Sequence, residues 1–181
     1  QYEMEFFAND LETALGELMR VDEIWINELV TYQNLYGTLE RILRLKREQG
    51  AKILMLLHDF FALCPAVNLI DAKGKYCGVP SCDVCDKCVP DNRSNACTEY
   101  GSGTLWRTKF REFLSNCDEI RAFSDDTAKL FKRAYPDVYN LHVIPHAPHY
   151  LPAVKKTRKT TETFNIGLIG VLCYKKGLDV V

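Results

Sequence analysis

One short apolar run constrains the fold of this chain more than any other feature of its sequence. Residues 53–57 read Ile-Leu-Met-Leu-Leu, which is long enough for a buried β-strand and too short for a buried helix. The run ends at His58 and Asp59. A parallel strand would carry both side chains to the carboxyl edge of its sheet, where ligands bind in open α/β sheets. We therefore predict a functional site at this strand end, with His58 as a hydrogen-bond donor and Asp59 as the group that orients it.

Helical and strand patterns alternate along the rest of the chain. Gln33–Gln49 has the apolar spacing of an amphipathic helix, and Gly50 follows it as a helix-ending glycine. Further helices are predicted at Asp10–Arg20, at Leu105–Leu114 and from a Ser124 or Asp125 cap to Ala134, and strands at Glu23–Asn27, Lys52–Leu57, Glu119–Phe123 and Leu141–Ile144. This alternation of helices and strands predicts an α/β fold with a Rossmann-like parallel sheet. Residues 59–103 are rich in Gly, Pro, Asp, Asn and Cys, and we predict one long cysteine-rich loop there.

Four closely spaced cysteines lie in that predicted loop: Cys77, Cys82, Cys85 and Cys88. The Cys-x2-Cys steps bring two sulfurs onto one ion, and four thiolates complete the tetrahedron that zinc prefers. A structural zinc would order a loop that has little apolar content of its own. Cys64 or Cys97 is a possible replacement for one of the four ligands. Two alternatives stay open, namely an iron–sulfur cluster and unliganded thiols.

Composition narrows the class of protein. Of 181 residues, 47% are hydrophobic and 26% charged, which is a globular composition. The 23 basic and 24 acidic residues nearly cancel, which argues against a nucleic-acid partner. The eight cysteines crowd into one region of an α/β pattern, which favours a reducing compartment over a disulfide framework. With no membrane-spanning run and no signal peptide, we expect a cytoplasmic protein, and peripheral membrane association of a longer form stays open.

The composition changes after residue 150. Residues 1–150 are predicted to form the first domain, and 151–163, with a basic run at Lys155–Lys159, to form a linker. Residues 164–181 then have the pattern of the first strand, turn and helix of a second Rossmann-like domain that is cut short. In the turn, Gly170 and Lys176 are candidate contacts to a phosphate, because a helix N-terminus and a lysine both favour negative charge.

Four segments in this order resemble glycosyltransferase family 4, whose members have the two-domain GT-B fold: His58–Pro65 with the cysteines after it, Cys117–Thr127, Val143–Pro148 and Ile166–Val181. The resemblance implies that the chain contains an acceptor-side N-terminal domain and the start of the donor-binding domain. It also implies that His58 reaches the donor sugar, and that Gly170 and Lys176 hold the donor diphosphate.

The function we expect from the sequence is that of a retaining glycosyltransferase. It would transfer a sugar from a nucleotide-diphosphate sugar to a hydroxyl of a saccharide or lipid-linked saccharide, without a catalytic metal, in polysaccharide or glycoconjugate synthesis. We expect residues 1–181 alone to be inactive, because most of the donor-binding domain is missing from them. The main alternative is a zinc-stabilised interaction module without catalysis. A nicotinamide-dependent oxidoreductase is disfavoured, because the sequence has no G-x-G-x-x-G motif.

Overall fold

A computed structural model of the chain describes residues 20–30, 32, 34–97 and 101–146. Contacts divide the chain into two units, Gln1–Pro145 and His146–Val181, and the fold below is that of the first unit. Several predictions lie outside the described residues. They are the helix at Asp10–Arg20 apart from Arg20 itself, the linker at 151–163, and the strand, turn and helix at 164–181 with Gly170 and Lys176.

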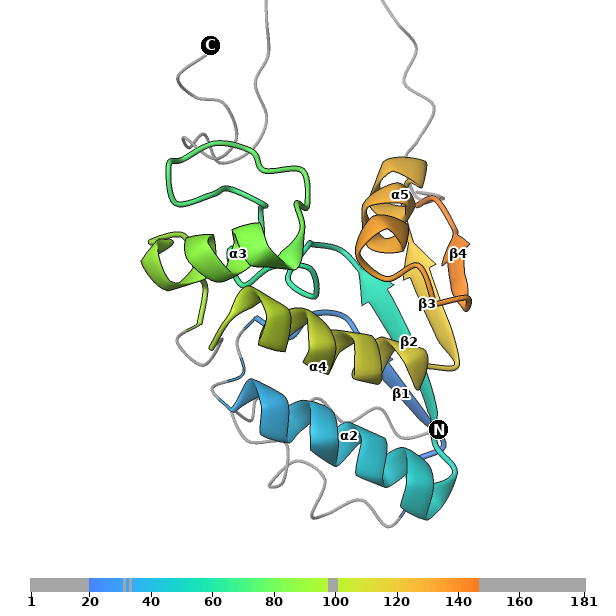
Figure 1. Cartoon of the computed structure of the whole chain (residues 1–181). Helices are drawn as coiled ribbons and strands as arrows, with labels where there is room; N and C mark the ends of the chain where they lie inside the picture. The colour runs from blue at the N-terminus through green and yellow to red at the C-terminus, as the bar shows by residue number, and fades with distance from the viewer. Residues whose placement is uncertain (1–19, 31, 33, 98–100, 147–181) are drawn as a thin grey trace, which may run out of the picture. The chain divides into compact units, whose positions relative to one another are not determined.

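The sheet is parallel throughout and has four strands (Figure 1). They are β1 (Glu23–Ile26), β2 (Lys52–Leu57), β3 (Glu119–Ala122) and β4 (Leu141–Val143), and they lie in the sheet in that order. The prediction of an α/β fold with a Rossmann-like parallel sheet is therefore confirmed. β2 has its predicted bounds, and each of the other three strands ends one residue earlier than predicted.

A helix connects each strand to the next: α2 (Leu35–Gln49) after β1, α4 (Gly103–Ser115) after β2 and α5 (Asp125–Ala134) after β3. Their ends follow local sequence signals. The side chains of Asn34, Ser102 and Ser124 accept hydrogen bonds from backbone N–H groups in the first turns of α2, α4 and α5. At the end of α2, Gly50 has φ of 72°, a left-handed conformation that glycine adopts without steric cost.

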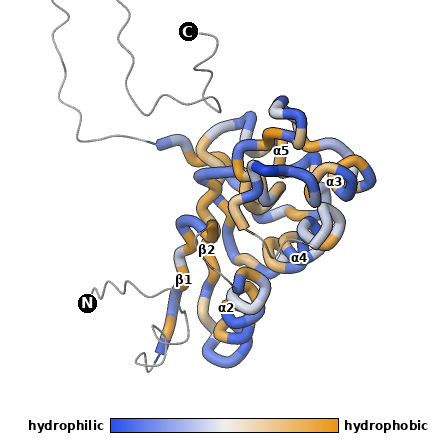
Figure 2. Tube along the Cα trace, turned by 90° about the vertical axis from the view of Figure 1, so that its left-hand side faces the viewer, coloured by the Kyte–Doolittle hydropathy of each residue, from blue (hydrophilic) through white to orange (hydrophobic). Residues whose placement is uncertain are grey.

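The core lies between the sheet and these helices. Each crossover connects a strand to its next neighbour in the same direction across the sheet. Because crossovers between parallel strands are right-handed, all the connecting helices lie on one face of the sheet. Figure 2 shows the hydrophobic residues of β2 beside α2 and α4 and hydrophilic residues at the outer end of α2. Aromatic rings of α4 fill the centre, and the ring centroids of Trp106 and Phe61 are 4.9 Å apart. Trp106, Phe110 and Phe113 are fully buried, as the predicted apolar side of this helix requires.

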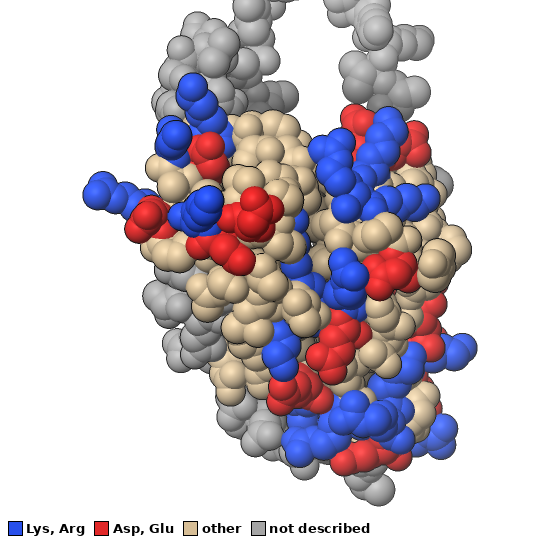
Figure 3. Space-filling model, viewed as in Figure 1, with Lys and Arg blue, Asp and Glu red and all other residues tan. Residues whose placement is uncertain are grey.

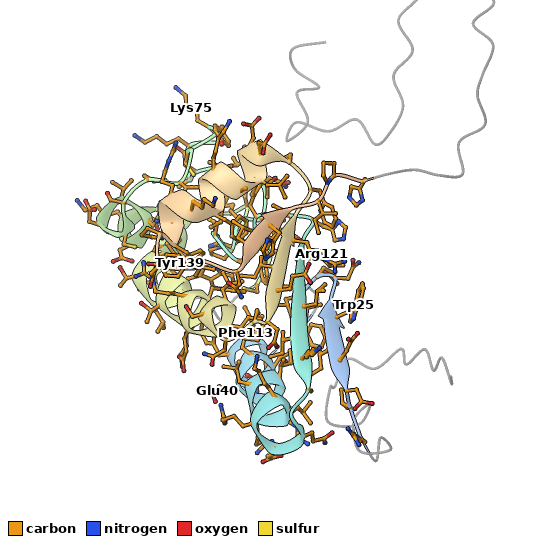
Figure 4. All side chains as sticks on the ribbon, turned by 90° about the vertical axis from the view of Figure 1, so that its right-hand side faces the viewer. Trp25, Glu40, Lys75, Phe113, Arg121 and Tyr139 are labelled. Carbon is orange, nitrogen blue, oxygen red and sulfur yellow. The ribbon has the colours of Figure 1, made fainter. Side chains whose placement is uncertain are left out.

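The opposite face of the sheet carries polar and aromatic side chains. Trp25 and Arg121 point away from α2 and α4 (Figure 4). The guanidinium carbon of Arg121 lies 5.3 Å from the Trp25 ring centroid, and its Nε lies 2.5 Å from a carboxylate oxygen of Glu119. Trp25 is still 57% exposed, so within the described residues this face is only partly covered.

The prediction of a loop throughout residues 59–103 is wrong in part. Residues Cys82–Cys88 form helix α3, and Val89–Asp91 form a 3-10 turn directly after it. A spacing of three residues between cysteines fits a helical repeat as well as a loop. Asp83 in the first turn and Lys87 in the last also favour a helix through its dipole.

The buried thiol of Cys117 makes the stability of this fold depend on pH in the alkaline range. Burial raises the pKa of the Cys117 thiol to about 12, and its Sγ donates a hydrogen bond to the Phe113 carbonyl. In the unfolded chain the same thiol ionises near its ordinary value of 9.0. Its contribution to stability is therefore complete below about pH 9 and is lost as the pH rises above that value.

We expect Cys117 to account for about 1 kcal/mol of lost unfolding free energy at about pH 10. Urea unfolding at about pH 8 and pH 10 measures this loss. The Cys117→Ala variant should lose less stability than the wild type between the two pH values. An equal loss in both proteins would show that other groups cause the alkaline effect.

Candidate functional site

The candidate site begins at the carboxyl edge of two inner strands. His58 directly follows β2 and Phe123 directly follows β3, and the two rings stack with centroids 4.5 Å apart and planes inclined by 23°. The His58 residue is exposed, and its backbone N–H donates to the Leu56 carbonyl. The structure therefore presents an imidazole at the sheet edge that the sequence pattern indicated, backed by an aromatic ring.

Asp59 organises the turn that leaves this edge. Its Oδ1 accepts a hydrogen bond from the Phe61 backbone N–H at 2.8 Å, as Asp side chains commonly do in turns. Partial burial raises the pKa of Asp59, and the nearby Glu28 carboxylate adds to the increase, whereas the Phe61 N–H and His58 oppose it. A raised pKa at a strand end is one mark of a functional carboxylate. That Asp59 orients His58 in catalysis stays a prediction.

Three side chains, two from α4 and one from the residue that follows α5, hold the segment after Asp59. The indole Nε1 of Trp106 donates to the Phe61 carbonyl at 2.9 Å, and the Tyr135 hydroxyl donates to the Ala62 carbonyl at 2.5 Å. Arg107 Nε donates to the next carbonyl, that of Leu63, at 3.4 Å. All three donors are buried. Because buried carbonyls need partners, these bonds fix the path of the chain from His58 to Cys64.

We expect Tyr135→Phe to lower the free energy of unfolding by about 1–3 kcal/mol, because it leaves the buried Ala62 carbonyl without its donor. The ring itself remains, so no cavity forms. Tyr139→Phe is the matched control, since Tyr139 is 87% exposed (Figure 4), and it should change stability little. Urea unfolding of the two variants measures the difference. Equal stabilities would mean that the hydroxyl of Tyr135 contributes nothing.

The cysteines predicted as zinc ligands do not all lie in one place. Cys77, Cys85 and Cys88 line one cavity of about 520 Å³, and the fourth thiol on its wall belongs to Cys64. Cys82 is not on this wall, and its Sγ lies 3.9 Å from Arg107 Nη1. Side chains of both charges, among them Asp71, Lys73 and Lys87, complete the lining, and Figure 3 shows acidic and basic groups intermixed around α3.

Nitrogen donors contact three of these four sulfurs. Arg107 Nη2 lies 3.2 Å from Cys85 Sγ, the Ala66 N–H donates to Cys64 Sγ at 3.5 Å, and Asn92 Nδ2 lies 3.8 Å from Cys88 Sγ. Burial raises the pKa of Cys64 to about 11 and also raises that of Cys85, where the Arg107 guanidinium opposes it. Within the described ranges, no group of three or more His, Cys, Asp or Glu residues is placed to hold a metal ion. The zinc site at Cys77, Cys82, Cys85 and Cys88 therefore stays a prediction.

Sequence reasoning did not find the residues that support this site. Arg107, Asn92 and Tyr135 are all buried, yet none stood out from its neighbours in the sequence. The only available signal was Arg107 itself, a charged residue next to the apolar side of its predicted helix. Gly170 and Lys176, the candidate phosphate contacts, lie outside the described residues.

The chain was compared with known protein families, curated proteins and solved structures. No family model, no curated protein and no solved structure matches the chain. A search of the described residues for a membrane-spanning helix found none of sufficient length and apolarity.

Proposed function

We propose that the chain contributes the acceptor-side domain and part of the donor-binding domain of a retaining glycosyltransferase of the GT-B type. The observation that carries this proposal is the His58 imidazole at the carboxyl edge of the inner strand β2, stacked on Phe123 from the neighbouring strand end. This edge is where open α/β sheets bind ligands. The resemblance of four ordered segments to glycosyltransferase family 4 supports the same reading.

The proposed reaction transfers a sugar from a nucleotide-diphosphate sugar to an acceptor hydroxyl with retention at the anomeric carbon. His58 would donate a hydrogen bond to the donor sugar as charge develops in the transition state, and Asp59 would support it. Gly170 and Lys176 would bind the departing diphosphate, so that no catalytic metal is required. The acceptor would be a saccharide or a lipid-linked saccharide, and the protein would work in the cytoplasm, with peripheral membrane association when the acceptor is lipid-linked.

The proposal is tested in a protein that carries the complete second domain. Such a protein is incubated with a panel of nucleotide-diphosphate sugars and saccharide acceptors, and release of the nucleotide diphosphate is measured with and without a chelator. We expect release that depends on both donor and acceptor and that the chelator does not abolish in an assay completed within minutes. No release with any donor, from protein shown to be folded, would overturn the proposal.

A second candidate function is a metal-stabilised interaction module without catalysis. The observation that favours it is the group of four thiols around one cavity, whose lining includes neither His58 nor Asp59. A module of this kind would bind metal and show no turnover. The transferase assay therefore separates the two candidates.

A further inference from the structure

Three separate segments of the chain bring four thiols to one cavity. Cys64 comes from the turn after β2, Cys77 from the segment paired with residues 69–70, and Cys85 with Cys88 from α3. Residues three apart on a helix share a face, so α3 presents two thiols to the cavity at once.

The framework around the cavity is tightly built. α3 packs so closely on α4 that a Cβ at Gly103 would lie 2.4 Å from the Cβ of Cys85. The Asp86 carboxylate accepts two bonds from Thr104, from its backbone N–H at 2.7 Å and its hydroxyl at 2.6 Å. Opposite α3, the Cys77 N–H bonds to the Leu69 carbonyl at 2.9 Å. These contacts set the backbone positions of Cys77 and Cys85, and the sulfurs can still turn about their side-chain bonds.

We infer that Cys64, Cys77, Cys85 and Cys88 become the four ligands of one thiolate-bound metal centre when their side chains turn toward the cavity that they line. In the metal-free arrangement, no three potential ligands among the described residues are yet placed to hold an ion. Sets of four thiolates are typical of zinc ions and of iron–sulfur clusters, and both need the same ligand chemistry. This ligand set differs from the one that the spacing alone indicated, because Cys64 takes the place of Cys82. The inference is independent of the proposed glycosyltransferase function.

The surroundings of the sulfurs suit a metal centre better than free thiols. A centre with four thiolates carries excess negative charge, and the buried guanidinium of Arg107 lies 3.2 Å from Cys85 Sγ. Hydrogen bonds from Ala66 and Asn92 reach the sulfurs of Cys64 and Cys88. Such outer contacts orient ligands and tune the metal. In binding, each thiol would give up its proton to solvent as its sulfur bonds to the metal.

Cys82 provides the internal control. It belongs to the same Cys-x2-Cys pattern and the same helix, and like Cys85 it contacts Arg107, but it is not part of the cavity wall. A site defined by sequence spacing would use Cys82, whereas a site defined by the fold would use Cys64. Substitution of Cys64 and of Cys82, one at a time, distinguishes the two possibilities.

The test begins with the full chain purified without chelator and analysed for zinc, iron and acid-labile sulfide. We expect about one metal centre per chain. Zinc without visible absorption would identify a single ion, and iron with sulfide and visible absorption would identify a cluster; either result supports the inference. Cys64→Ser should lose the metal and Cys82→Ser should keep it. Metal-free protein, or loss of metal from Cys82→Ser with retention in Cys64→Ser, would overturn the inference.

A second measurement needs no variant, and it covers the case in which Cys64→Ser does not fold. The unmodified chain is alkylated with and without a chelator, and the modified cysteines are located by peptide mapping. Cys64, Cys77, Cys85 and Cys88 should become more reactive when the chelator is present, while the reactivity of Cys82 stays constant. A chelator effect on Cys82 in place of Cys64, or no effect on any cysteine, would contradict the proposed ligand set.

Discussion

In a protein with a complete donor-binding domain, His58→Ala is expected to lower kcat by about 10²-fold or more, with little change in melting temperature. His58 is exposed at the end of β2, and its ring stacks on Phe123 at the surface and not within the core. Removing it takes away the donor that we propose for the reacting sugar, without creating a cavity. Steady-state kinetics and thermal unfolding of the same protein preparation measure the two effects.

His142→Ala is the matched control for this experiment. His142 lies on β4 and is also exposed, but the proposed mechanism gives it no role. Its substitution should leave kcat within about a factor of two, since surface changes seldom cost more than about 0.5 kcal/mol. The opposite pattern, in which His58→Ala lowers the melting temperature and keeps normal turnover, would identify His58 as a structural residue.

The sheet was predictable because its strands carry their own signals. Ile53–Leu57 is a continuous apolar run, and a parallel strand covered on one face and half-covered on the other needs such a run. The carboxyl edge followed from the same reasoning, since all four strands are parallel. His58 could therefore be placed at the edge without knowledge of its neighbours. The stacking partner, Phe123, lies 65 positions further along the chain and has no local signal that links the two.

The cysteine-bearing segment was less predictable, because its structure depends on contacts that are distant in sequence. Local composition indicated a loop, but packing against α4 at Gly103 and the Asp86–Thr104 bonds support α3. Once α3 is helical, the direction of each cysteine depends on its place around the helix. Cys85 and Cys88 then line the cavity and Cys82 does not. Spacing alone contains no such information.

Arg107 is the residue on which this arrangement depends most. It is only 7% exposed, and its guanidinium joins three parts of the chain through the Leu63 carbonyl at 3.4 Å, the Pro80 carbonyl at 2.7 Å and the Cys85 sulfur at 3.2 Å. A planar group with several fixed donors suits this role, whereas lysine offers a single point charge. We therefore expect its loss to affect the turn after β2 and α3 together.

Arg107→Met should lower the free energy of unfolding by about 3 kcal/mol, because it preserves apolar volume but removes the guanidinium donors to the buried Leu63 carbonyl and the half-buried Pro80 carbonyl. Arg107→Lys should recover only part of the loss. The control is Arg111→Met, one turn later on α4. Arg111 makes an exposed ion pair with Asp137 at 3.5 Å and one hydrogen bond to the Ala134 carbonyl at 3.3 Å, so its loss should cost less, about 1–2 kcal/mol. Urea unfolding gives the free energies. Limited proteolysis under native conditions reports on residues 64–97, which should be cleaved faster in Arg107→Met than in Arg111→Met. If Arg107→Met and Arg111→Met were equally stable and equally resistant to cleavage, the three contacts of Arg107 would not hold the segment together, and its path would have to be set by the apolar packing of α3 on α4 alone.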